Sequence, residues 1–249
     1  MELRDRVAFV TGASGGLGRV IALTLARHGC DVALGYRSRS ELADEVRSEI
    51  EEMGRQAISL SIDQTDPDSV QASVQRCLAD LGRLDILVNN AAWMTAVPFK
   101  DLDALTPEIW DRIYDTNVRG PFLLARACAS HLREHGAGRI VNVSAFIGLS
   151  PEGSSIAHAT SKAALIHLNR CLAVALAPEI TVNSVAPGLM EGTELFERIP
   201  SEATEAARER AALKRHTKLQ DVADQVVGFC QSDSITGQVV VVDAGLVFH

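Results

Sequence analysis

The fold expected for this chain depends most on one glycine-rich stretch, Thr11-Gly12-Ala13-Ser14-Gly15-Gly16-Leu17-Gly18. It follows a short apolar run, Val7 to Val10, and leads directly into a helical pattern from Leu17 to His28. A glycine run alone predicts only a tight turn. Between the first strand and the first helix of a chain, however, such a run is typical of a turn that approaches a phosphate group. The stretch therefore favours an α/β fold built outward from this turn.

Short apolar runs and longer helical patterns alternate along the rest of the chain. Strands that are apolar on both faces predict a parallel sheet covered by helices, and right-handed crossovers make it doubly wound. We expect strands at 7–10, 32–36, 57–62, 86–88, 140–143, 180–185 and 238–242. We expect helices at 17–28, 41–53, 69–81, 107–135, 156–177 and 221–230. The sequence thus predicts an α/β, Rossmann-type, doubly wound parallel sheet of seven strands in one domain, residues 1–249.

One segment, at about 189–215, interrupts this alternation. It is too long for a plain connection and contains charged helical pieces, which is typical of a lid over a substrate site. We therefore expect a substrate lid there.

The composition excludes several classes of partner. The 249 residues include 32 acidic and 24 basic side chains, so a formal net charge of −8 disfavours nucleic acid and anionic membrane surfaces. The five cysteines are odd in number and form no metal-binding motif, and no apolar run reaches the length of a membrane span. We expect reduced core cysteines, no metal, a cytoplasmic location and a small-molecule substrate.

The residues after the first two strands predict the ligand. Glycines let backbone amides approach a pyrophosphate, and the N-terminus of the following helix supplies unpaired N–H groups. The second strand then ends at Tyr36-Arg37-Ser38-Arg39, where a site that prefers NAD usually has a carboxylate. Guanidinium groups here would pair with a 2′-phosphate, which favours NADP(H) over NAD(H). The alternative is that Arg37 and Arg39 are solvated surface charges.

Several motifs in the same order resemble the short-chain dehydrogenase/reductase family over nearly the whole chain, and among its members the 3-oxoacyl-carrier-protein reductases. They are the 11–18 turn, Asn89-Asn90-Ala91-Ala92, Asn117, Lys162 and Pro187-Gly188. The resemblance implies a single-domain NAD(P)-dependent oxidoreductase, commonly a homotetramer, many of whose relatives reduce ketones or oxidise secondary alcohols.

The resemblance also implies roles for individual residues. Asp63 matches the carboxylate that contacts the adenine amine, Asn90 the residue that supports the central strands, and Lys162 the lysine that holds the nicotinamide ribose. Asp63 could instead cap a loop, and Asn90 could satisfy backbone groups at a strand end. The implied coenzyme-binding set is Gly12, Ser14, Gly15, Gly16, Leu17, Gly18, Tyr36, Arg37, Ser38, Asp63, Gln64, Asn90, Ala91, Lys162, Pro187, Gly188, Met190 and Thr193.

Asn117 can be checked on physical grounds. In an α-helix its carbonyl would accept from the residue four positions later, which is Pro121 and has no N–H. We therefore expect the helix to open here, leaving an acceptor for a water molecule. In the family, the matching asparagine anchors a water beside the catalytic lysine. The alternative is a purely structural kink.

The pattern departs from the family at the catalytic positions. The proton-donating tyrosine of the family stands four residues before the lysine, which puts both on one helical face, but here that position holds His158. The catalytic serine falls on Ala145. Neighbouring Ser144 is no substitute, because adjacent residues at a strand end point in different directions. The catalytic set is therefore Asn117, Ala145, His158 and Lys162.

His158 can be a proton donor or can merely fill the space of the tyrosine. An imidazole transfers protons near neutral pH, and a nearby Lys162 ammonium would favour its neutral form. Its outer nitrogen, however, reaches roughly 2 Å less far than a tyrosine hydroxyl. Three interpretations stay open: a reductase with altered acid chemistry acting on a carbonyl or imine-like substrate, a coenzyme-binding protein with little turnover, or an impaired form, natural or designed, of an ordinary reductase.

Overall fold

The computed structural model describes residues 1–248 and contains one parallel sheet of seven strands. Its strand order is β3-β2-β1-β4-β5-β6-β7, with every neighbouring pair parallel. The strands are β1 Val7–Thr11, β2 Asp31–Tyr36, β3 Ala57–Ser61, β4 Ile86–Asn89, β5 Gly138–Val143, β6 Ile180–Pro187 and β7 Val239–Val242. The chain winds outward from β1 in one direction and from β4 in the other, which confirms the predicted doubly wound sheet.

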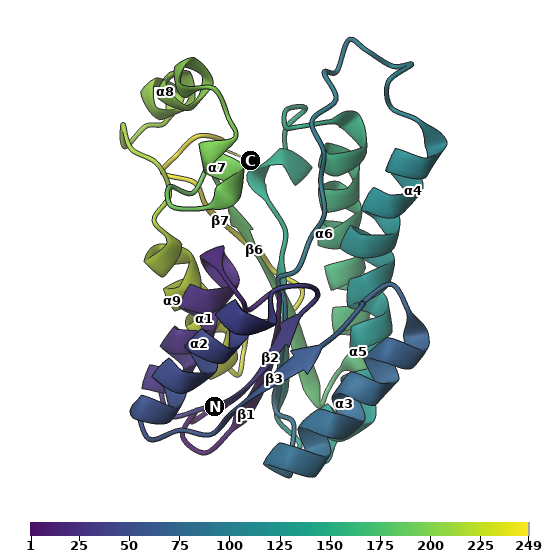
Figure 1. Ribbon diagram of the computed structural model, residues 1–249, viewed down its shortest axis with the longest axis vertical. Coiled ribbons are helices and arrows are strands. Elements are labelled where there is room, and N and C mark those ends of the chain that lie inside the picture. Colours follow the sequence, from purple (N-terminus) through teal and green to yellow (C-terminus); the bar gives the residue numbers. More distant parts are fainter. Residues whose placement is uncertain (249) are drawn as a thin grey trace.

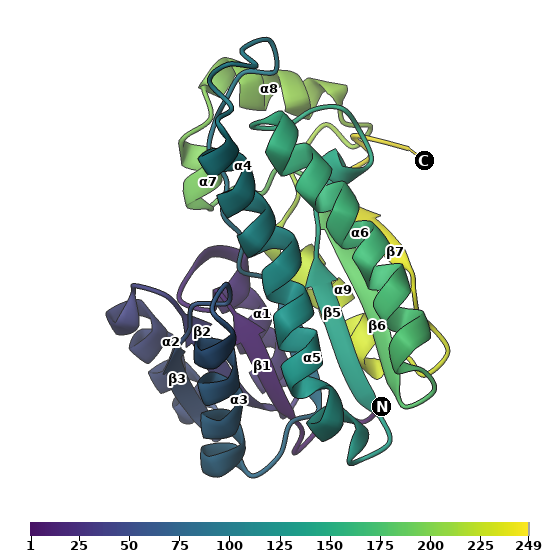
Figure 2. The same cartoon turned by 90° about the vertical axis from the view of Figure 1, so that its right-hand side faces the viewer.

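Helices cover both faces of the sheet (Figure 1). The helices and helical turns are α1 Gly16–Arg27, α2 Ser40–Glu52, α3 Pro67–Leu81, α4 Pro107–Tyr114, the π-helix Asp115–Arg119, α5 Gly120–Arg133, the 3₁₀ turn Phe146–Gly148, α6 Ile156–Leu176, α7 Glu194–Glu197, α8 Ser201–Arg210 and α9 Leu219–Gln231. Figure 2 shows α5 and α6 side by side on one face. Helices α1, α2 and α9 cover the other face, and each layer has its own apolar core.

Two predictions need correction. The helix expected at 107–135 is divided into α4, a π-helical turn and α5, because the proline and glycine at 120–121 disturb the regular hydrogen-bond pattern. Cys171 is exposed on the outer side of α6, whereas the other four cysteines are buried as expected. No disulfide joins the cysteines of residues 1–248. Within the same residues, no helix has both the length and the apolar character needed to cross a bilayer.

Candidate active site

The glycine turn joins β1 to the N-terminus of α1. Helix α1 begins after Gly15 with no side chain bonded to its first N–H groups and no acidic residue in its first turn. Four backbone N–H groups of a helix start have no partner within the helix, and their partial positive charge attracts an anion. The start of α1 therefore fits a pyrophosphate, with Ser14 half-buried in the turn and Leu17 buried in the core behind it.

Three glycines are required by the geometry of this turn. Gly12 and Gly16 have φ of +66° and +53°, in the left-handed region that favours glycine. Gly18 lies so close to the Gly12 carbonyl that a Cβ would overlap its oxygen. The start of α1 is thus held close to the Gly12 carbonyl that follows β1.

The loop after β4 is fastened to the same turn. Thr11 Oγ1 accepts hydrogen bonds from the backbone N–H groups of Asn90 and Ala91, both at 3.0 Å. Asn90 Nδ2 donates to the carbonyls of Thr11 and Gly12, at 2.9 and 3.3 Å. Asn90 therefore supports the ends of the central strands, as the resemblance implied, and it does so by satisfying backbone groups, as the alternative proposed.

The residues after β2 form the expected basic corner, with carboxylate partners that the sequence did not predict. Tyr36 ends β2, and Arg37, Ser38 and Arg39 are exposed beyond it. Arg37 pairs with Asp63 at 2.8 Å. Arg39 makes a two-pronged pair with Glu194. A 2′-phosphate would have to replace these carboxylates.

Asp63 and Gln64 both have structural roles. Asp63 Oδ1 accepts from the N–H and hydroxyl of Thr65, at 3.0 and 2.7 Å, so it does cap the loop after β3. Gln64 is buried, and its Nε2 donates to the carbonyls of Ala91 and Thr116, at 3.1 and 2.7 Å. Contact of either residue with a coenzyme stays a prediction.

The interruption around Asn117 is a π-helical turn, Asp115–Arg119, in which the Gly120 N–H donates to the Asp115 carbonyl. The expected opening of the helix is therefore confirmed. The buried Asn117 side chain also clamps the loop after β4. Its Oδ1 accepts from the Trp93 N–H at 2.8 Å, and its Nδ2 donates to the Trp93 carbonyl at 3.0 Å and to Ser161 Oγ at 3.1 Å. Binding of a water by its main-chain carbonyl stays a prediction.

Lys162 and His158 are buried one turn apart on α6, on one helical face as predicted from their spacing. Lys162 Nζ donates to the Val143 carbonyl at the end of β5, at 3.0 Å. Burial lowers the pKa of Lys162 to about 8. Burial and, second, the charge of Lys162 lower the pKa of His158 to about 3, so the imidazole is neutral at physiological pH.

The serine missing from position 145 is not replaced by its neighbour. Ser144 Oγ donates to the Val185 carbonyl at 3.1 Å and accepts from Ser184 Oγ at 2.9 Å, both on β6. Its hydroxyl is therefore committed to the interior of the sheet. Ala145, the next residue, is extended and half-buried and has no polar side chain.

Two serines that the sequence analysis did not single out hold His158. Ser155 precedes α6 and its Oγ accepts from the His158 backbone N–H at 3.1 Å. Ser154 Oγ lies 2.8 Å from His158 Nδ1. Helical spacing could not have revealed this contact, because Ser154 lies before the cap of α6.

The segment expected as a lid follows β6. Buried Pro187 ends β6, and half-buried Gly188 donates its N–H to the Val242 carbonyl at 2.9 Å. Thr193 Oγ1 donates to the Met190 carbonyl at 2.9 Å, and a Cβ at Gly16 would touch the Thr193 methyl group at 3.9 Å. The base of this segment is therefore beside the glycine turn.

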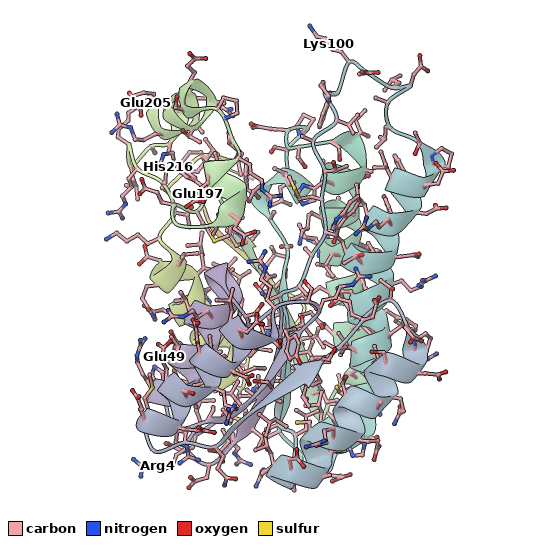
Figure 3. All side chains as sticks on the ribbon, in the orientation of Figure 1. Arg4, Glu49, Lys100, Glu197, Glu205 and His216 are labelled. Carbon is pink, nitrogen blue, oxygen red and sulfur yellow. The ribbon has the colours of Figure 1, made fainter. Side chains whose placement is uncertain are left out.

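The rest of this segment projects from one end of the molecule. Figure 3 labels Glu197, Glu205 and His216 there, and Lys100 on the loop between β4 and α4, which projects at the same end. The Phe196 and His216 rings pack edge to face, with their centroids 4.8 Å apart.

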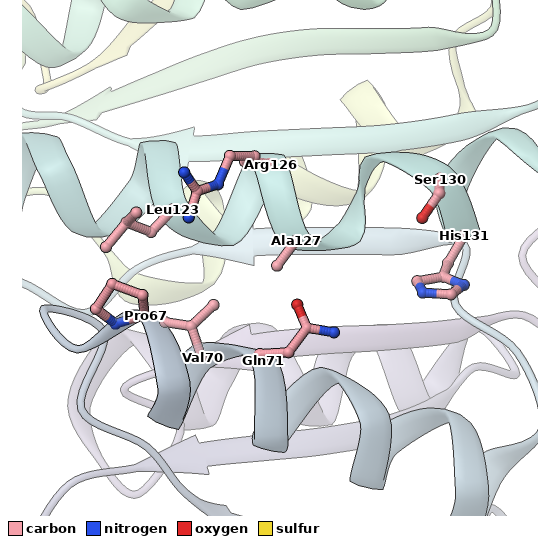
Figure 4. Close-up of a pocket in the computed structure, with 8 residues that line it drawn as sticks. All are labelled: Pro67, Val70, Gln71, Leu123, Arg126, Ala127, Ser130 and His131. Carbon is pink, nitrogen blue, oxygen red and sulfur yellow. The ribbon is translucent and has the colours of Figure 1, made fainter.

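A hollow elsewhere on the surface lies between α3 and α5 (Figure 4). No predicted site residue lines it. Its lining consists of Pro67, Val70, Gln71, Leu123, Arg126, Ala127, Ser130 and His131. The candidate active site is therefore the region around the glycine turn, Lys162 and His158, and not this hollow.

Known proteins resemble this chain over nearly its whole length. A family model described as enoyl-(acyl carrier protein) reductase matches residues 12–247. A 3-oxoacyl-acyl-carrier-protein reductase of Thermotoga maritima is 34% identical, and the match covers 99% of this chain and 100% of that protein. A cis-4-hydroxycyclohexanecarboxylate dehydrogenase of Sinomonas cyclohexanicum is 34% identical, covering 97% and 96%.

Among solved structures, a short-chain dehydrogenase of Burkholderia cenocepacia J2315 in complex with NADP is 37% identical. Its TM-score is 0.91, and the match covers 99% of each chain. Fold, site geometry and relatives agree: this chain belongs to the short-chain dehydrogenase/reductase family and resembles its 3-oxoacyl-acyl-carrier-protein reductases.

Proposed function

We propose that this chain is an NADP(H)-dependent oxidoreductase that transfers a hydride to a small carbonyl or imine-like substrate, with an acid chemistry that does not use tyrosine. When bound, the reduced coenzyme would supply the hydride. The start of α1 would hold its pyrophosphate and Lys162 its nicotinamide ribose. Thr193 and Met190 would approach the carboxamide from the lid at 189–215.

The buried ammonium of Lys162 is the observation that carries this proposal. Taking an ammonium out of water costs on the order of several kcal/mol, so a fold has no packing reason to bury one without partners. An ammonium has three N–H donors, yet Lys162 Nζ makes a single hydrogen bond within residues 1–248, to the Val143 carbonyl. The remaining donors fit the two hydroxyls of a ribose.

The preference for NADP(H) is supported by Arg37 and Arg39 beyond β2. Their partners Asp63 and Glu194 compete with a 2′-phosphate, but all four side chains are substantially exposed. Exposed ion pairs contribute only about 0–1 kcal/mol, so a doubly charged phosphate can displace the carboxylates. The NADP bound to the Burkholderia relative agrees with this preference.

The acid chemistry follows from the neutral state of His158. A neutral imidazole has one N–H that can donate to a substrate oxygen, but it is a far weaker acid than an imidazolium. Ala145 offers no second donor, and loss of one such donor costs other enzymes about a hundredfold or more in rate. We therefore propose slow reduction of ordinary ketones and faster reduction of a C=N substrate that already carries its proton.

The alternative is a coenzyme-binding relative with little or no turnover. The observation that favours it is the close burial of His158, which also suits a side chain that only fills the space of a tyrosine.

Single-turnover oxidation of NADPH, followed by its absorbance with a panel of ketones and cyclic imines, separates the two. The proposal expects oxidation with the imines at least tenfold faster than with the ketones. Binding of NADPH without oxidation by any substrate would support the alternative.

The double substitution Ala145→Ser with His158→Tyr tests whether the chain is an impaired form of an ordinary ketone reductase. A large gain in ketone reduction would support that interpretation. No gain would favour either the altered chemistry or a protein that only binds coenzyme.

We also propose that the protein is a cytoplasmic homotetramer. Apolar side chains are exposed on the outer helices, among them Phe122 on α5 and Val174 on α6, the latter 83% exposed. Helix pairing through α5 and α6 would cover them. Light scattering that returns the mass of a monomer would contradict this.

A further inference from the structure

We propose that Ser154 is a positioning residue for His158: its hydroxyl donates to Nδ1 and so fixes the imidazole as the tautomer whose hydrogen is on Nε2. The inference rests on the proposed function, because only a bound substrate gives that Nε2–H group a task. Ser154 would thereby determine which ring nitrogen of His158 donates to a substrate.

Neighbouring contacts hold the serine hydroxyl in place. The Ser154 carbonyl accepts from the Val97 N–H at 2.8 Å, which ties it to the loop between β4 and α4. Ser155, the next residue, is fully buried and accepts from the His158 backbone N–H. The two serines therefore contact both the backbone and the ring of His158, the ring through the 2.8 Å contact from Ser154 Oγ to Nδ1.

The direction of the Ser154 hydrogen bond sets the tautomer of His158. The imidazole is neutral, so one ring nitrogen carries a hydrogen and the other accepts. Within residues 1–248, Nδ1 is the recorded hydrogen-bond partner of the Ser154 hydroxyl. Donation from the serine to Nδ1 uses the hydroxyl hydrogen, which has no other hydrogen-bond acceptor within residues 1–248, and it leaves the ring N–H on Nε2 for a bound substrate. The ammonium of Lys162, the charged neighbour on α6, donates to the Val143 carbonyl and not to the imidazole, so it does not require a bare Nε2.

The tautomer determines how far the N–H group of His158 extends toward a substrate. Nε2 is the ring nitrogen farther from Cα, so fixing the hydrogen there places the only donor of the imidazole as far toward a substrate as this side chain allows. The donor interpretation requires this tautomer, whereas a histidine that merely fills space is served by either one, so the tautomer itself separates the two interpretations.

Nitrogen-15 NMR of the full-length protein tests the inference without any turnover. Proton-bearing and bare ring nitrogens resonate far apart, and the spectrum of His158→Gln identifies the signals of His158 among the seven histidines. We expect a bare Nδ1 and a protonated Nε2 in the wild type. Ser154→Ala should give a mixture of tautomers, and Ser154→Thr, which keeps the hydroxyl, should restore the single form.

Ser150→Ala is the matched control, because it removes a hydroxyl from the same loop that has no hydrogen-bond partner within residues 1–248. It should leave the His158 signals unchanged. A protonated Nδ1 in the wild type would overturn the inference, even if Ser154→Ala failed to fold, and so would an unchanged tautomer in Ser154→Ala.

Calorimetric titration of the same samples with NADPH keeps the two proposals apart. If the protein binds NADPH but His158 carries its hydrogen on Nδ1, only the role of Ser154 is rejected. Absence of binding in the wild type would reject the proposed function.

Discussion

Acid should destabilise this protein through His158, and the size of the effect can be worked out. The pKa of His158 is about 3 in the folded protein, against 6.5 for an ordinary histidine, because of burial and then the charge of Lys162. The folded pKa is the lower one, so between these values the unfolded chain binds a proton that the folded protein does not. Stability is therefore lost as the pH falls below the unfolded pKa, with a limiting slope of about 1.4 kcal/mol per pH unit.

Lowering the pH from about 6.5 to about 4.5 should cost about 2 kcal/mol of unfolding free energy from this residue alone. The assay is urea unfolding at several pH values and one fixed protein concentration, because any oligomer would make stability depend on concentration. Carboxylates also titrate in this range, so the comparison must be with His158→Gln, which removes only the titrating ring.

The difference in unfolding free energy between wild type and His158→Gln should change by about 2 kcal/mol over this interval, with the wild type losing more. Parallel pH profiles would contradict a lowered pKa of His158, because they would mean that the imidazole is solvated and titrates normally in the folded state.

Three further predictions concern the coenzyme site and its support. Glu194→Gln should tighten NADPH binding by a few-fold and leave NADH binding unchanged in calorimetry, because it frees Arg39 for a 2′-phosphate; equal effects on both coenzymes would argue against competition at Arg39. Gly120→Ala should destabilise the protein by about 1–3 kcal/mol in urea unfolding, because a Cβ would lie 2.8 Å from Gln64 Cγ. Helix propensity alone predicts the opposite, a stabilisation by about 1 kcal/mol, and that result would show that the Gln64 side chain moves aside. Gly18→Ala should abolish NADPH binding in the same titration, because its Cβ would displace the glycine turn, and retained affinity would contradict the close packing of that turn.

The fold was predictable because its determinants are local. The apolar runs and the 11–18 turn repeat a strand-to-helix pattern whose periodicity is visible in the sequence, and the observed strands differ from the expected ones by only a residue or two at most ends. The opening of the helix at Asn117 was predictable for the same reason, since Pro121 removes a particular N–H group.

The partners of the site residues were not predictable. Arg39 and Glu194 are 155 residues apart in the sequence and meet only because the segment after β6 returns to the end of β2. Gln64 bridges one carbonyl in the loop after β4 and one in the π-helical turn, which depends on tertiary packing that no periodicity encodes. Side-chain pairing of this kind is decided by loop conformation, so the charges could be located from the sequence but their partners could not.

We propose that the glycine turn, Lys162 and the arginines after β2 form a site for NADP(H). Isothermal titration of the wild-type protein with NADPH and, separately, with NADH examines this site without any turnover. We expect saturable binding of one NADPH per chain, tighter than that of NADH. No saturable heat with either coenzyme, or tighter binding of NADH, would contradict it.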